Sequence, residues 1–142
     1  MYRIVRVNTR NMPQKEQALY DMYTIVDAGY YWKMSEQIEI PYGTPMIAMG
    51  GHGGRGLYLF GISNGDWEQY NDGGEYHLRI PVVWQPVIYS LPPESVEEIG
   101  AMCKRWNLRF GCQATQGEFR NALHHILSFG NALNPYNYAN AA

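Results

Sequence analysis

The chain has 142 residues, of which 46% are hydrophobic, 17% charged and 14% aromatic, and this length fits one domain with a sizeable buried core. The aromatic content and the modest charge argue against disorder. No apolar run approaches the roughly 20 residues of a membrane span, and the first eight residues lack a signal-peptide core, so we expect a cytoplasmic protein with no membrane partner. A formal net charge of −2 disfavours a general nucleic-acid coat but permits a local basic patch.

The N-terminal part predicts a strand followed by a helix. Residues 2–8 (YRIVRVN) are rich in β-branched side chains, which favours a first strand. Pro13 separates this strand from an amphipathic helix over residues 14–29, with its end near the glycine. The aromatic stretch 29–33 (GYYWK) is too short to predict an element.

The middle of the chain predicts three strands. Residues 45–49 (PMIAM) and 57–63 (LYLFGIS) are apolar runs joined by the glycine-rich turn GGHGGRG, which indicates a hairpin. Residues 64–74 are rich in Asn, Asp and Gly and predict a loop. Residues 76–84 (YHLRIPVVW) predict a third strand, in which Pro81 favours an edge or a bulge.

The C-terminal third predicts two helices and a short strand. The two prolines at 92–93 open a helix that extends to about residue 105, and residues 110–115 predict a strand. Thr115 and Glu118 have the spacing of a capping box ahead of a second amphipathic helix.

Together these elements predict a single α+β domain over residues 1–130, a small mixed β-barrel with flanking helices, followed by a polar tail or linker over residues 131–142.

Signatures of catalysis and metal binding are not found. Cys103 and Cys112 have no metal-knuckle spacing, and the adjacent His124 and His125 diverge on a helix, so one surface and one partly buried histidine are expected. The serines lie in no nucleophile-elbow context. We therefore expect a binding domain that is not itself an enzyme, with no catalytic residues, no metal and no cofactor.

The glycine-rich turn at residues 50–56 has two interpretations. It lacks the Lys-Ser/Thr pair and the following helix of a P-loop, so a nucleoside triphosphate site is disfavoured. It is either a simple hairpin turn or a turn in which His52 and Arg55 contact a nucleic-acid phosphate.

Aromatic residues are the most informative candidates. Trp32 follows Tyr30 and Tyr31, and Trp67 lies in a polar loop. These residues either complete the core or stack on a ligand, since aromatic faces bind bases and surround methylated groups. Trp84 lies within a predicted strand, which favours the core.

The order of elements resembles the EVE domain, a member of the PUA-like superfamily related to YTH readers. The resemblance extends over about residues 1–130 and depends on five segments: YRIVRVN (2–8), YYWKM (30–34), PMIAMGG (45–51), GRGLYLFGISNGDW (54–67) and LRIPVVW (78–84).

The resemblance implies that a single base is held in an aromatic-walled pocket. Several such domains are sensors of modification-dependent restriction systems, in which a 5-methyl- or 5-hydroxymethylcytosine is flipped out of duplex DNA. Carried onto this chain, the pocket walls would be Trp32 and Trp67, with Tyr30 or Tyr31 as a third face. The acceptors for the cytosine amine would be Ser63, Asn64 and Asp66, and the phosphate contacts would be Arg10, His52, Arg55 and Arg79.

The expected partners are modified double-stranded DNA and a nuclease, present either as a domain of a longer chain or as a separate subunit. Three alternatives remain open. The chain is an RNA-binding PUA/YTH-like reader of a modified base, a small PUA-like hydrolase or nuclease that uses His52 or His77 with Lys33 or Asp66, or an interaction protein whose aromatic residues form a partner interface.

Overall fold

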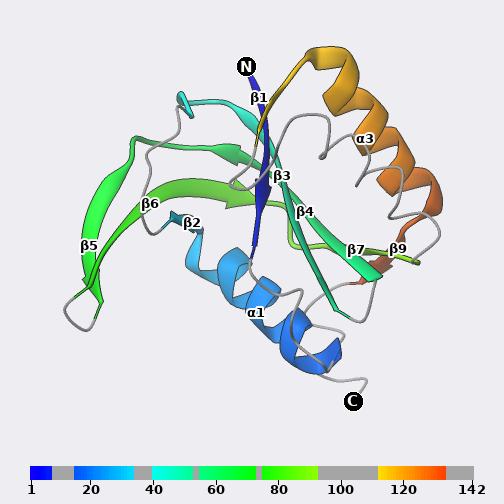
Figure 1. The fold of residues 1–142 in the computed structure, drawn as a ribbon, viewed down its shortest axis with the longest axis horizontal. Coiled ribbons are helices and arrows are strands. Elements are labelled where there is room, and N and C mark those ends of the chain that lie inside the picture. The colour runs from blue at the N-terminus through cyan, green and yellow to red at the C-terminus, as the bar shows by residue number, and fades with distance from the viewer. Residues whose placement is uncertain (8–14, 34–39, 53–54, 73–74, 93–111, 134–142) are drawn as a thin grey trace.

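A computed structural model describes residues 1–7, 15–33, 40–52, 55–72, 75–92 and 112–133 (Figure 1). In chain order the elements are β1 (Tyr2–Arg6), α1 (Lys15–Ala28), β2 (Tyr30–Lys33), β3 (Pro45–His52), β4 (Arg55–Ser63), β5 (Glu68–Asp72), β6 (Glu75–Trp84), β7 (Ile88–Leu91), β8 (Cys112–Ala114), α3 (Gln116–Phe129) and β9 (Asn131–Leu133). The helix predicted over 92–105 lies almost entirely outside the described residues. Neither described helix is long and apolar enough to cross a membrane.

The strands of the described residues form one nine-stranded mixed sheet. Its main path runs β2-β6-β4-β3-β1-β8, while β5 pairs with β6, β7 with β4, and β9 with β7. The β1–β3 pair is parallel, and the remaining pairs are antiparallel. Within the described ranges, the terminal strands β2 and β8 do not pair with each other. The predicted mixed α+β class is confirmed, but the sheet is open and the predicted closed barrel is not observed.

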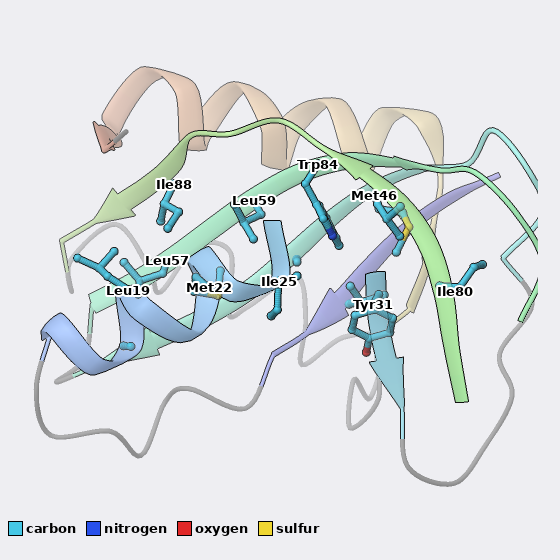
Figure 2. Close-up of a cluster of buried hydrophobic side chains, with 14 of the residues drawn as sticks. Leu19, Met22, Ile25, Tyr31, Met46, Leu57, Leu59, Ile80, Trp84 and Ile88 are labelled. Atoms are coloured by element: carbon cyan, nitrogen blue, oxygen red, sulfur yellow. The ribbon is translucent and has the colours of Figure 1, made fainter. Parts of the chain in front are cut away.

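The two described helices, α1 and α3, pack on opposite faces of the sheet. Leu57 and Leu59 of β4 belong to a buried cluster that includes Met22 of α1 (Figure 2). Tyr58, the residue between them, belongs to a second buried cluster that includes Ile126 of α3. Because successive strand residues point to opposite faces, β4 contributes to both cores and lies between the helices.

Local signals at the helix ends are confirmed. Helix α1 is followed by Gly29, which has a φ of 71°, and the Gly29 amide donates to the Ile25 carbonyl at 3.1 Å. At the start of α3, Thr115 and Glu118 form the predicted capping box: the Thr115 hydroxyl accepts from the Glu118 amide at 3.2 Å, and the Glu118 carboxylate accepts from the Thr115 amide at 3.0 Å. Each bond satisfies an amide that a helix start leaves without an intrahelical partner.

The predicted hairpin over residues 45–63 is confirmed, and its ladder extends to the His52–Arg55 pair. Four short strands were not predicted, and one of them is β7 over Ile88–Leu91. The aromatic stretch forms β2, the polar segment expected to be a loop contains β5, and the expected tail begins with β9, which pairs with β7. Strands β2, β7 and β9 pair with strands that are distant in the sequence, a constraint that local composition does not carry, whereas β5 forms a hairpin with the adjacent β6.

Pro81 lies at an interruption of the ladder on one side of β6. The β5–β6 ladder ends at the Glu68–Arg79 pair, and the β4–β6 ladder begins at the Ser63–Val82 pair. Pro81 therefore occupies the gap between two ladders on one side of β6, where no strand requires the amide proton that proline lacks.

Candidate functional site

Tyr30 and Tyr31 lie on opposite faces of β2. Tyr31 is 5% exposed and belongs to the α1-side core, together with its ladder partner Ile80 (Figure 2). Tyr30 is half-buried, and the guanidinium carbon of Arg79 lies 4.3 Å from the centroid of its ring. Since alternate residues of a strand face opposite sides, the two tyrosines do not line one common pocket.

Tyr31 contacts Trp67 at the rim of the core. Their ring centroids are 6.3 Å apart with an interplanar angle of 60°, an edge-to-face arrangement. The Tyr31 hydroxyl donates to the Arg6 carbonyl at 3.2 Å, and burial raises the pKa of Tyr31 to about 12. Trp67 is half-buried and packs against the α1-side core. This pair therefore contributes to the core.

Arg79 interacts with residues from both strands that flank β6. Its guanidinium lies over the ring of Tyr30 from β2, and its Nε atom lies 2.5 Å from Oε1 of Glu68 from β5. The side chains of Arg79 and Glu68 are 32% and 43% exposed, so this ion pair is accessible from solvent. Exposed ion pairs contribute only about 0–1 kcal/mol to stability, which means that the pair can be rearranged at low cost.

The loop after β4 approaches the same region through Pro81, which is the ladder partner of Tyr30. The Asn64 amide donates to the Pro81 carbonyl at 2.8 Å, and a Cβ atom on Gly65 would lie 3.0 Å from Cγ of Pro81. Asn64 and Asp66 are exposed on either side of this contact. We use the name Tyr30–Arg79 surface for the set Tyr30, Asn64, Asp66, Glu68, Arg79 and Pro81.

Ser63 belongs to a buried turn. Its side chain is 1% exposed, its hydroxyl donates to the Pro41 carbonyl at 2.5 Å, and it accepts from the Thr44 amide at 2.9 Å. Both hydrogen-bonding functions of the hydroxyl thus join β4 to the turn before β3, and we assign Ser63 a structural role there.

Backbone positions alone are described for three further candidates. Trp32 is the β2 ladder partner of Arg79, so its Cα lies beside the Tyr30–Arg79 surface. His52 and Arg55 pair at the far end of the β3–β4 hairpin. Strand β4 has nine residues, and at about 3.3 Å per residue it separates this end from Ser63 by roughly 26 Å. Arg10 lies outside the described residues.

Glu68 is the functional candidate that sequence reasoning missed. A loop over residues 64–74 carries no register, so the sequence prediction does not place Glu68 opposite Arg79. The sequence does contain a signal for this pairing. The run NDGG at residues 71–74 is typical of a hairpin turn, and it precedes the predicted strand over residues 76–84.

Metal ligands do not gather in the described part of the chain: no group of three His, Cys, Asp or Glu side chains is found there. On α3, His124 is exposed, whereas His125 is half-buried with its ring 4.9 Å from that of Phe129. The prediction of one surface and one partly buried histidine is confirmed.

Comparison with known proteins adds no assignment, since no protein-family model, curated protein or solved structure matches the chain.

Proposed function

We propose that the chain is a modified-base reader, which binds DNA carrying a flipped 5-methyl- or 5-hydroxymethylcytosine at the Tyr30–Arg79 surface. In this proposal the open mixed sheet is a PUA-like, EVE-type fold, and the domain is the sensor of a cytoplasmic modification-dependent restriction system. A nuclease domain or subunit would act after recognition.

The observation that carries the proposal is the Arg79 guanidinium held 4.3 Å from the Tyr30 ring centroid on a partly exposed sheet surface. Unstacked bases bind to aromatic rings and to guanidinium planes. An arginine positioned by an aromatic ring also presents a positive charge to a phosphate. One side chain pair therefore offers both a stacking surface and a phosphate contact.

The neighbouring loop supplies groups suited to a cytosine edge. The exposed Asp66 and Asn64 carry oxygen acceptors, and the N4 amine of cytosine is a donor. Trp32, the ladder partner of Arg79, is proposed as a second aromatic contact beside them.

The binding free energy is expected to come mainly from one base and less from contacts to the phosphate backbone. Flipping costs a few kcal/mol, and each stacked base recovers about 1–3 kcal/mol. A chain with a net charge of −2 gains little from general attraction to DNA. Stacking and hydrogen bonding at one base would then supply most of the affinity.

The test is a fluorescence-anisotropy titration with four 12-base-pair duplexes. They differ at a single cytosine, which is plain, 5-methyl, 5-hydroxymethyl or glucosylated. We expect tighter binding of one modified duplex and a loss of about tenfold for that duplex in Tyr30→Ala. Arg79→Ala should weaken the binding of all four duplexes, with the largest loss for the preferred one, because it removes both a phosphate contact and part of the stacking surface.

Two control variants match these changes at distant sites. Tyr20→Ala removes a tyrosine that is 70% exposed on α1, and Arg120→Ala removes an exposed arginine on α3. Both variants should bind the four duplexes with the affinities of the wild-type protein. Equal affinity of that protein for all four duplexes would contradict the DNA-reader proposal. Selective binding of a single-stranded RNA with a modified base would favour the RNA-binding alternative.

A further inference from the structure

We propose that Glu68 determines the specificity of the Tyr30–Arg79 surface by opposing ligands that bind through phosphate alone. This inference deepens the proposed function and rests on it.

The carboxylate of Glu68 contacts the guanidinium of Arg79 directly. Glu68 on β5 is the ladder partner of Arg79 on β6, and its Oε1 atom lies 2.5 Å from Nε of Arg79. Directly opposite residues in an antiparallel pair lie on the same face of the sheet. A phosphate that reaches Arg79 therefore arrives beside a carboxylate on the same face.

The carboxylate makes such an approach unfavourable. A phosphate and a carboxylate a few Å apart repel each other, and the phosphate must share or replace the ion pair that Arg79 already makes. The penalty falls on the charged backbone of any nucleic acid. It does not fall on the stacking of a neutral base, which needs the guanidinium plane and the Tyr30 ring but no net positive charge.

The consequence is a larger difference in affinity between modified and unmodified DNA. Phosphate contacts are the same for every sequence and every modification, so a surface that binds them strongly also retains unmodified DNA. With Glu68 in place, backbone contact alone is weakened, and the contribution of the bound base decides whether a complex persists. Lower affinity for unmodified partners is a form of specificity.

The variant Glu68→Gln separates charge from position. The glutamine oxygen can still accept a hydrogen bond from Nε of Arg79, so the guanidinium keeps a partner while the negative charge is lost. We expect this variant to bind the unmodified 12-base-pair duplex about threefold to tenfold more tightly, with a steeper dependence on salt. Affinity for the phosphate-free nucleoside 5-methyl-2′-deoxycytidine should stay within about twofold, so that the preference for modified DNA falls.

Two comparisons identify the origin of the gain. Asp21→Asn removes a half-exposed carboxylate on α1, and it reproduces the change in net charge on a different element from the ion pair. We expect a gain of less than about twofold from this control. In the Arg79→Ala background, Glu68→Gln should also give less than about twofold, because the two residues act as a coupled pair.

The outcomes separate this inference from the proposed function. A protein that prefers a modified duplex, together with a Glu68→Gln variant that binds unmodified DNA no more tightly, overturns the role of Glu68 and leaves the reader proposal intact. A Glu68→Gln gain that depends on Arg79, in a protein that does not discriminate among the four duplexes, supports opposition to phosphate and contradicts base reading. Failure of both proteins to bind any duplex overturns both proposals.

Discussion

Tyr31→Phe removes one buried hydroxyl group and keeps the aromatic ring that packs in the core. The hydroxyl donates to the Arg6 carbonyl at 3.2 Å, in a residue that is 5% exposed. A hydrogen bond of this kind contributes about 1 kcal/mol net. We therefore expect the free energy of unfolding at pH 7 to fall by about 1 kcal/mol.

At alkaline pH the same substitution should raise the free energy of unfolding relative to the wild-type protein. Burial raises the pKa of Tyr31 from 10.0 to about 12, so the unfolded chain ionises at lower pH than the folded protein. The stability that this difference provides is fully present below pH 10 and is lost as the pH rises from 10 through 12. At about 1.4 kcal/mol per pKa unit, the native protein loses roughly 1.4 kcal/mol by pH 11 through this residue, and the phenylalanine variant does not.

Urea unfolding followed by circular dichroism at pH 7, 9, 10 and 11 measures both effects. The native protein should be the more stable at pH 7, and the order of stability should reverse near pH 11. Tyr20→Phe, at a tyrosine that is 70% exposed, should change stability by less than about 0.5 kcal/mol at pH 7. Equal stability at pH 7 with parallel losses above pH 10 would refute a buried Tyr31 hydroxyl and return Tyr31 to the candidate pocket.

Further predictions concern the residues that shape the sheet beside the site. A Cβ atom on Gly61 would lie 2.5 Å from Cε3 of Trp84, so Gly61→Ala should lower the free energy of unfolding by about 1–3 kcal/mol in urea titrations. Gly117→Ala is the control, because a Cβ atom at Gly117 would meet no atom within 4 Å. This substitution should stabilise α3 by about 0.5 kcal/mol. Destabilisation by both substitutions would contradict the steric argument. Ser63→Ala removes the acceptor of the buried Thr44 amide and should cost about 1–2 kcal/mol, whereas unchanged stability would argue against a structural role.

Local signals in the sequence predicted much of the fold. The glycine after α1, the capping box of α3 and the glycine-rich hairpin act over a few residues, so their effect can be recognised without knowledge of distant contacts. Trp84, expected in the core, is 6% exposed there, and its indole Nε1 donates to the Tyr30 carbonyl at 3.1 Å.

Long-range pairing determined most of the parts that were not predicted. Strand β2 exists because β6 pairs with it, and the alternation of a strand then separates Tyr30 from Tyr31. Without knowledge of that strand, Tyr30 and Tyr31 are equal alternatives for the third face of the pocket. Glu68 has a different cause: its β6 partner lies in the adjacent hairpin strand, and the local turn signal at residues 71–74 was interpreted as part of a loop. Ser63 is fixed by Pro41 and Thr44, 22 and 19 positions away, a relation that no local pattern reveals.

The central claim is that one base binds at the Tyr30–Arg79 surface, and two-dimensional ¹H–¹⁵N NMR tests it most directly. The labelled protein is titrated with a 12-base-pair duplex that carries the preferred modified cytosine, and the side-chain Nε–H signal of Arg79 is followed together with the backbone amides. The account predicts that the largest shifts occur at Tyr30, Asp66, Glu68 and Arg79, with little change on α3. Shifts confined to α3 or to the β3–β4 hairpin end, or no shifts at saturating duplex, would contradict it.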